Sequence, residues 1–361
     1  MQTTYAYRSG LRHPREEPIS ASNPVRRSDA GPGLEGLVER ALDGDRTSLA
    51  RAISLVENET PEARFVLERA YPCTGQGIRI GITGPPGAGK STLVARLARR
   101  YRDQGEQVAI VAVDPTSPFS GGALLGDRVR MVELAGDPGL FIRSMASRGS
   151  LGGLAVTTSE VCDLLEAAGF TRLLVETVGV GQSELEVAEA ADSVVVVLVP
   201  ESGDGVQAMK AGLMEIGDVF VLNKADRDGA ERAAQEVSAV LALKKPAPGA
   251  WRPPVVLTAA NQGKGVDDLV EQIARHLAHL NEQGLLRERR RRRLRARVID
   301  LVRARAVGRL IERVPEARWN EILGSLEARR RTPHQAAALL WEEAWPEDAS
   351  HPAAQGKGRA T

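Results

Sequence analysis

The sequence is poor in aromatic residues and carries almost no net charge. Aromatic residues make up 4% of the 361 residues, so the core must be built mainly from Val, Leu, Ile and Ala. The formal net charge of +1 argues against a dedicated nucleic-acid-binding protein, which normally carries a strong positive excess. We therefore expect no nucleic acid among its partners.

Cysteines and long apolar runs are also scarce. Cys73 and Cys162 lie far apart and form no Cys-x-x-Cys motif, a pattern that favours buried thiols in a reducing cytoplasm. No apolar run approaches the ~18 residues of a membrane-spanning helix. Residues 1–33 lack the apolar core of a secretory signal. We expect a cytoplasmic protein with no membrane association.

Five segments of different character follow one another along the chain. Residues 1–33 are polar and are predicted to be a flexible tail, and residues 34–76 have the spacing of an N-terminal helical extension. Residues 77–282 alternate strands and helices. Residues 283–345 are helical and rich in arginine, and residues 346–361 are predicted to be a disordered tail.

Six compact apolar runs in the central segment are predicted strands: residues 78–83, 107–114, 172–177, 194–199, 218–224 and 254–260. Near-continuous apolar strands are buried on both faces, as in parallel sheets, and the segments between them are long enough for crossover helices. The predicted fold class is therefore α/β, with a doubly wound, mostly parallel sheet.

Residues 84–91, GPPGAGKS, match the phosphate-binding motif Gly-x-x-x-x-Gly-Lys-Ser/Thr at every defined position. The motif follows a predicted strand and opens a predicted helix, which is the context it requires. Its glycines let backbone N–H groups turn toward phosphates. We expect Lys90 to reach the β- and γ-phosphates and Ser91 to ligate Mg²⁺. The predicted nucleotide contacts in this loop are Gly84, Pro85, Pro86, Gly87, Ala88, Gly89, Lys90, Ser91 and Thr92.

A second motif, Asn223-Lys224-Ala225-Asp226, follows the fifth predicted strand and indicates guanine. The Asp226 carboxylate can accept hydrogen bonds from N1–H and the exocyclic amine of guanine together, and adenine has no donors in that arrangement. We expect Asn223 to brace the loop and the stem of Lys224 to lie over the base. A backbone N–H that could meet guanine O6 is expected from Thr258, Ala259 and Ala260.

Three acidic residues, Asp114, Asp127 and Glu176, are candidates for the magnesium site. Carboxylates at the carboxyl ends of parallel strands face the ligand crevice. Because Mg²⁺ takes one or two carboxylates and keeps several waters, the sequence leaves open which of the three is a direct ligand. Val180 stands where many nucleotide hydrolases carry a water-orienting Gln, so we expect slow intrinsic hydrolysis.

With these motifs the sequence resembles the MeaB/ArgK-type P-loop GTPases, whose human member is the methylmalonic aciduria type A protein. They belong to a SIMIBI-type branch with Glu in place of Asp in the third guanine-nucleotide motif, here Glu176. The resemblance spans most of residues 34–345, including the C-terminal helical region. Its matching stretches are GPPGAGKST, VAVDPTSPFSGGALLGDRVRM, ASRGSLGGLA, VETVGVGQSE and VPESGDGVQAMKAGLMEIGDVFVLNKAD.

This resemblance implies a GTPase that converts GTP to GDP slowly alone and faster with an adenosylcobalamin-dependent acyl-CoA mutase. Nucleotide state would gate delivery of the cobalamin and removal of damaged cofactor. The family forms homodimers through C-terminal helical arms. The resemblance assigns Lys210 to the activated reaction and three carboxylates to Mg²⁺ and catalysis, so the expected catalytic residues are Lys90, Asp114, Asp127, Glu176 and Lys210.

Glycines support three mobile switch segments around these residues. Mobile segments need glycines and few apolar anchors, and they order when γ-phosphate and Mg²⁺ are bound. Gly179 in the second switch is also a predicted nucleotide contact. The glycines concerned are Gly121, Gly122 and Gly126 in the first switch, Gly179 and Gly181 in the second, and Gly203 and Gly205 in the third.

The main alternative function is a metallochaperone-type GTPase, which shares the sheet and the guanine signature. Such a protein needs soft or imidazole ligands at its metal site. His276 and His279 lie three residues apart on a predicted helix and could chelate a metal, but we expect them on a solvated helix face.

Two further alternatives concern the arginine run and the nucleotide. Residues 287–297 could bind phosphate backbones, but the near-neutral chain and the lack of interleaved aromatic residues favour a solvated helix face or pairing between subunits. An ATP-using transport kinase is disfavoured by the guanine motif at residues 223–226.

Overall fold

The computed structural model describes residues 32–115, 136–147, 153–177, 183–200, 212–243 and 249–346. Its elements, in chain order, are α1 (Pro32–Leu42), α2 (Arg46–Glu57), α3 (Ala63–Ala70), the 3-10 turn η1 (Tyr71–Cys73), β1 (Ile78–Thr83), α4 (Lys90–Asp103), β2 (Val108–Pro115), β3 (Leu140–Ser147), α6 (Gly153–Ala167), β4 (Arg172–Thr177), α7 (Ser183–Ala190), β5 (Ser193–Leu198), α9 (Leu213–Ile216), β6 (Val219–Leu222), α10 (Ala230–Leu243), β7 (Val255–Leu257), the 3-10 turn η4 (Ala260–Gln262), α11 (Val266–Glu282), α12 (Leu285–Arg313), α13 (Glu316–Glu327) and α14 (Pro333–Ala344).

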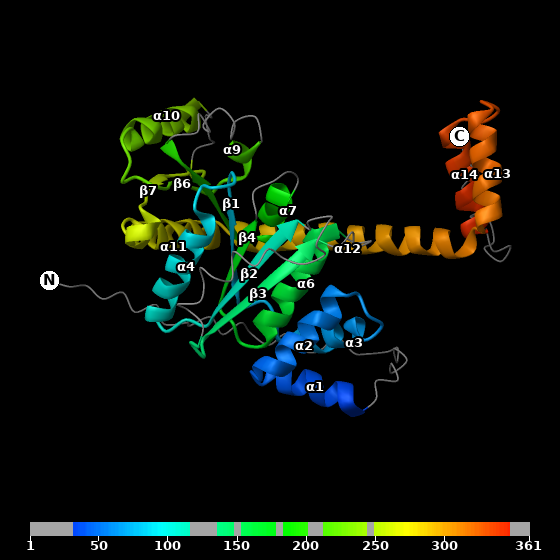
Figure 1. The fold of residues 1–361 in the computed structure, drawn as a ribbon, viewed down its shortest axis with the longest axis horizontal. Helices are drawn as coiled ribbons and strands as arrows, with labels where there is room; N and C mark the ends of the chain where they lie inside the picture. Colours follow the sequence, from blue (N-terminus) through cyan, green and yellow to red (C-terminus); the bar gives the residue numbers. More distant parts are fainter. Residues whose placement is uncertain are drawn as a thin grey trace, which may run out of the picture.

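The seven strands form one parallel sheet in the order β3-β2-β4-β1-β5-β6-β7, with helices on both faces (Figure 1). The predicted doubly wound α/β fold is confirmed. The apolar pattern missed β3, because polar residues such as Arg143 and Ser144 interrupt it. An edge strand tolerates that interruption, since a neighbouring strand flanks it on one side only.

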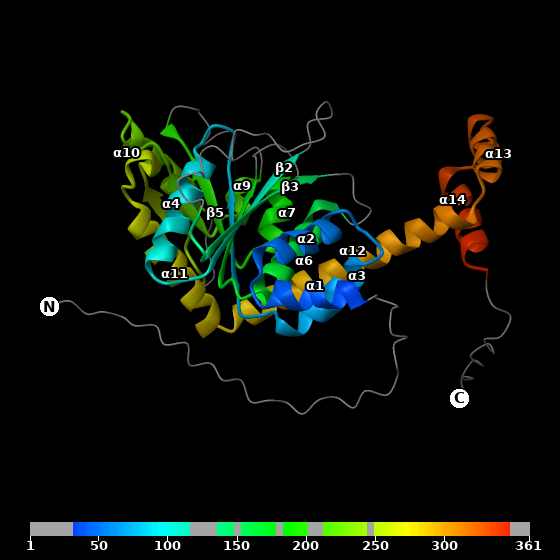
Figure 2. The same ribbon diagram turned by 60° about the horizontal axis from the view of Figure 1, so that its bottom comes forward.

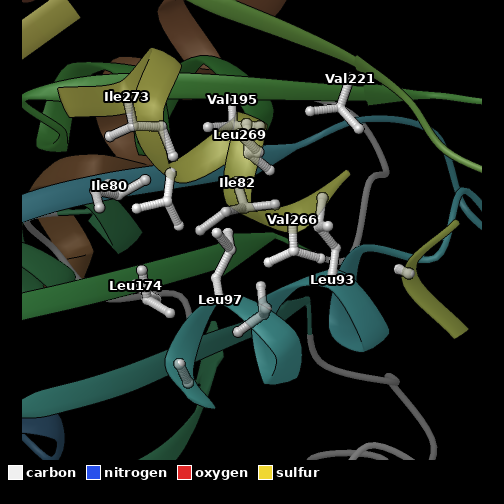
Figure 3. Packing of buried hydrophobic residues seen from close by; sticks show 14 of the residues in the cluster. Ile80, Ile82, Leu93, Leu97, Leu174, Val195, Val221, Val266, Leu269 and Ile273 are labelled. Atoms are coloured by element: carbon white, nitrogen blue, oxygen red, sulfur yellow. The ribbon is translucent and has the colours of Figure 1, made fainter. Parts of the chain in front are cut away.

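Alternate residues of the strands point to opposite faces of the sheet. On β1, Ile80 and Ile82 pack against Leu93 and Leu97 of α4 and against Ile273 of α11 (Figure 3). On the other face, β5, β6 and β7 pack against α9 and α10, β2, β3 and β4 pack against α6, and β1 lies against α7. These buried faces explain why the strands read as continuous apolar runs in the sequence.

The N-terminal extension, α1 to α3, packs against α6 and the β3 edge of the sheet. Asp45 caps α2 by accepting a hydrogen bond from the backbone N–H of Ser48 at 2.8 Å. Arg46 donates to the backbone carbonyl of Leu140 at 2.5 Å and lies over the ring of Phe141, which holds α2 against the start of β3.

The C-terminal region is a long helix followed by a helical hairpin. The 29 residues of α12 give a rod about 44 Å long at 1.5 Å per residue. Its first half lies beside α6, and its second half projects from the domain and carries α13 and α14 at the far end (Figures 1 and 2). Within the described residues, no helix is long and apolar enough to cross a membrane.

The arginine run at residues 287–297 falls in the first half of α12. The expectation that this run forms a solvated face or pairs between subunits is wrong for four of its members. Arg289, Arg290, Arg293 and Arg297 form ion pairs with acidic residues of the same chain.

Candidate nucleotide site

The phosphate loop leaves β1 through Gly84, which runs tightly against the neighbouring strand. Gly84 has a φ of +137°, and a Cβ at this position would lie 2.1 Å from the carbonyl oxygen of Val197 on β5. Gly89 has a φ of +87°, and its Cβ would lie 2.4 Å from Nδ2 of Asn223. Both positions therefore require glycine for conformation and for space.

Lys90 opens α4 and is held inside the loop. Its Nζ donates hydrogen bonds to the carbonyl oxygens of Gly84 at 2.8 Å and Pro85 at 3.0 Å, and the residue is 5% exposed. Among the described residues, no side chain caps the amino end of α4. The loop thus combines a fixed ammonium group with a helix amino terminus, an arrangement suited to an anion.

A hydroxyl and a carboxylate meet beside the loop. Ser91 Oγ donates to Oε1 of Glu176, at the end of β4, over 2.6 Å. Beneath them, the Thr177 and Thr83 hydroxyls lie 3.2 Å apart and join the ends of β4 and β1. Glu176 is 5% exposed. Its carboxylate and the Ser91 hydroxyl both present oxygen atoms, the ligands that Mg²⁺ prefers. These residues therefore fit a magnesium ion.

The remaining predicted catalytic residues are described only in part. Asp114 lies on β2 opposite Ala146 of β3, at the same edge of the sheet as Glu176, but its side chain is outside the described part. Asp127, Gly179 and Lys210 lie outside the described residues, as do the three predicted switch segments around them.

Asn223 joins the phosphate loop to the loop that follows β7. It is 2% exposed, and its Nδ2 donates to the carbonyl oxygen of Ala88 at 2.8 Å. Its Oδ1 accepts from the hydroxyl of Thr258 at 3.0 Å and from the backbone N–H of Ala260 at 3.1 Å. One amide side chain thus connects the phosphate loop, the residues 223–226 and the Thr258–Ala260 segment.

The rest of the predicted base-reading motif forms a turn after β6. Lys224 adopts a left-handed conformation with φ of +59°, and the backbone N–H of Ala225 donates to the carbonyl of Thr258 at 2.9 Å. Asp226 follows and is exposed to solvent. Because residues 223–226 and 258–260 leave the sheet to form these loops, β6 and β7 are shorter than the apolar runs predicted.

The family model of the methylmalonyl Co-A mutase-associated GTPase MeaB matches residues 49–315. The chain belongs to the MeaB family of GTPases. A Pyrococcus abyssi protein named as a GTPase is 46% identical over 312 residues, which cover 86% of this chain and 96% of the relative. The mouse mitochondrial methylmalonic aciduria type A homolog is 38% identical over 253 residues, covering 65% of this chain and 61% of that protein.

A solved structure extends the match to three dimensions. The crystal structure of a LAO/AO transport system kinase has a TM-score of 0.67 and 28% sequence identity, and the match covers 87% of this chain and 99% of the other. The resemblance to MeaB/ArgK-type GTPases is therefore confirmed at the level of family and of fold.

In this MeaB-family chain, Arg96 lies beside the candidate site and makes contacts that the sequence did not reveal. From α4 it donates to the backbone carbonyls of Ala260 and Asn261, each at 3.1 Å. It therefore ties the helix after the phosphate loop to the segment after β7, in parallel with Asn223. Nothing in its sequence position signals this, because an arginine on a helix is usually a solvated residue.

His276 does not lie on a solvated helix face, so that expectation is wrong. The residue is 1% exposed, its Nδ1 lies 2.9 Å from Ser193 Oγ, and its Nε2 lies 3.3 Å from Oδ1 of Asp218. The ring of Trp251 packs against the rings of both His276 and His279. Burial lowers the pKa of His276 to about 4.

This environment also bears on the metallochaperone alternative. Both ring nitrogens of His276 face protein groups, so the pair of histidines does not present two free imidazoles to a metal. Over the described ranges, no group of three or more His, Cys, Asp or Glu side chains is arranged to hold a metal ion.

Proposed function

We propose that this GTPase is a cytoplasmic chaperone of an adenosylcobalamin-dependent acyl-CoA mutase, methylmalonyl-CoA mutase or a relative. Its nucleotide state would gate delivery of the cofactor and protect or reactivate the mutase. The mutase link is supported by the name of the family model and by the relationship to the methylmalonic aciduria type A homolog. The GTP-binding part is supported by the geometry around Asn223.

The junction at Asn223 is the observation that carries the nucleotide assignment. It holds together two loops that would contact opposite ends of one GTP molecule: the phosphate loop at Ala88 and the base-reading segment at Thr258. Asp226 would accept hydrogen bonds from guanine, and a backbone N–H of the Thr258–Ala260 segment would meet guanine O6. The phosphates would lie on the loop 84–92 at the amino end of α4.

For hydrolysis, Lys90 would stabilise the negative charge that develops on the phosphates. Ser91 and one or two of the carboxylates of Asp114, Asp127 and Glu176 would hold Mg²⁺, and the ion would supply neutralising charge for the phosphates. The carboxylates that do not ligate the ion would orient the attacking water. With Val180 in place of a water-orienting Gln, turnover by the chain alone would be slow.

A homodimer through the C-terminal arm is part of the same proposal. The support is an exposed apolar stripe on α12. Its members are Leu294 (42% exposed), Val298 (59%), Leu301 (43%) and Val302 (62%). Exposed apolar residues at helical spacing are typical of a helix that packs against another helix.

The proposed function is tested by GTP turnover with and without purified acyl-CoA mutases. The candidates are the methylmalonyl-, isobutyryl-, 2-hydroxyisobutyryl- and ethylmalonyl-CoA enzymes, each with bound adenosylcobalamin. We expect slow basal turnover and a clear stimulation by one of them, with Lys90→Ala as the inactive control. GTP turnover that responds to none of these mutases would contradict the chaperone role, and ATP turnover above GTP turnover would contradict the guanine assignment.

A further inference from the structure

The first half of α12 carries four arginines that hold it to the GTPase domain, here called the arginine joint: Arg289, Arg290, Arg293 and Arg297. Their spacing places them on one face of the helix, turned toward the domain. Arg295 lies between them in sequence but is exposed to solvent. The arginines of residues 287–297 therefore fall into two groups: those that pair with the domain and those that face solvent.

Asp192 is the most buried acidic partner of the joint. It is fully buried, and its two oxygens accept hydrogen bonds from Arg290 at 2.8 and 3.1 Å and from Arg293 at 3.1 Å. It also accepts from the backbone N–H of Arg79, on β1, at 3.1 Å. Burial alone would raise the pKa of Asp192, but the charges of Arg293 and Arg290 lower it, so the carboxylate is ionised.

Asp163 of α6 makes a second three-way contact. One of its oxygens accepts from the side chain of Arg79 at 2.5 Å, and the other accepts from Arg297. Arg79 is 4% exposed and also donates to Glu166 at 2.7 Å. Two carboxylates, Asp163 and Asp192, thus each bind β1 and α12 at the same time.

Asp218 completes the joint at the start of β6. Arg289 donates to its two oxygens at 2.9 and 3.2 Å, and the Asp218 carboxylate also accepts from the backbone N–H of Val194 at 2.9 Å. Such forked contacts between guanidinium and carboxylate fix direction as well as distance.

Asp192, Asp218 and Arg79, the β1 partner of Asp163, lie where their strands begin, and the nucleotide loops lie where these strands end. Arg79 is the second residue of β1, Asp192 immediately precedes β5, and Asp218 immediately precedes β6. At their other ends, β1 runs into the phosphate loop and β6 into Asn223, while β5 lines Gly84 through Val197. Each strand is only four to six residues long, a span of about 13–20 Å.

We propose that the arginine joint makes the C-terminal arm and the nucleotide-binding loops one mechanical unit. The arm keeps a fixed direction relative to the GTPase domain. Nucleotide binding at the carboxyl ends of the strands therefore stabilises α12 at their amino ends. Buried carboxylates shared between β1 and α12 allow this, because neither element can shift without separating ionised groups in a water-poor environment. The inference rests on the proposed nucleotide site but not on the mutase.

The direction of the arm can be measured on the full chain by double electron–electron resonance, which gives the distance between two spin labels. One label is attached to the native, exposed Cys73, and the other to Glu327→Cys on α13; Cys162 is buried and stays unlabelled. Labelled protein is mixed with an excess of unlabelled protein to isolate distances within one chain. We expect a narrow distance distribution that broadens in Arg290→Met and is unchanged in the control Arg295→Met. An unchanged distribution in Arg290→Met would overturn the fixed direction of the arm.

The link to nucleotide is tested by hydrogen exchange of α12 with and without GDP. In the unmodified chain, GDP should slow amide exchange in residues 289–297, and Arg297→Met should lose this effect while still binding GDP. Arg297→Lys, which keeps the charge, provides a milder variant, and thermal unfolding identifies any chain that is not folded. GDP binding without any change in α12 exchange would overturn the joint, whereas absence of GDP binding in the unmodified chain would instead overturn the proposed site.

Discussion

Replacing Asn223 with alanine tests whether the two ends of the nucleotide site are held together before GTP arrives. The substitution removes three hydrogen bonds, to Ala88, Thr258 and Ala260, all made by a side chain that is 2% exposed. Each such bond contributes about 1 kcal/mol net, so about 3 kcal/mol of preorganisation is lost. If GDP binding must restore that arrangement, its affinity falls by roughly a hundredfold.

The assay is titration of a fluorescent GDP analogue, read beside thermal unfolding so that loss of affinity is separated from loss of fold. Asn261→Ala is the matched control: it is an exposed asparagine in the same segment, and its side chain accepts from the neighbouring N–H of Gln262. Thr258→Val, which removes one of the three bonds, should weaken GDP binding about tenfold or less. A folded Asn223→Ala chain with the affinity of the control would refute the reasoning.

Three further predictions concern other parts of the chain. Asp226→Asn should shift preference from GTP toward xanthosine triphosphate, because the amide donates where the carboxylate accepted; competition between the two nucleotides measures this, and unchanged GTP use would contradict the guanine assignment. Burial lowers the pKa of His276 to about 4, below the ~6.5 of an unfolded histidine. Between these pH values the unfolded chain binds a proton that the folded chain does not. The free energy of unfolding therefore falls by about 3 kcal/mol as the pH drops from 6.5 to 4. Urea titrations should show that the free energy of unfolding falls less between pH 7 and pH 5 in His276→Gln than in the exposed control His334→Gln. An equal fall in both variants would contradict this role of His276. Val298→Glu should convert dimer to monomer by light scattering, since it places a charge on the exposed stripe of α12, and an unchanged mass would remove that stripe from the interface.

Much of the fold could be predicted from the sequence because its strands are buried on both faces. Runs such as residues 193–198 consist almost entirely of apolar residues, and every residue of β5 is buried. The edge strand β3 was not predicted, because the polar Arg143, which pairs with Glu57 of α2, interrupts its apolar run. Because an edge strand is flanked on one side only, its sequence shows the hydrophobic pattern of a buried strand least clearly.

The loops of the site could be predicted because their chemistry constrains the backbone as well as the side chains. Gly84 must be glycine to pass Val197, and Asn223 must present a donor and an acceptor at once. The arginine joint could not be predicted in this way. Arg297 pairs with Asp163, which lies 134 residues earlier, and no local pattern distinguishes Arg297 from the exposed Arg295.

The joint explains how a strongly basic helix can belong to a chain of almost zero net charge. Asp163, Asp192 and Asp218 are spread over the chain, and the fold brings them beside α12, where they form ion pairs with the four domain-facing arginines. A single carboxylate there would be too costly to bury, but each has at least one guanidinium partner. Asp192 and Asp218 lie at the starts of β5 and β6, and Asp163 binds Arg79 at the start of β1. The ion pairs of α12 therefore also connect it to the strands that end at the nucleotide loops. Charge balance and mechanical connection are therefore two consequences of one set of contacts.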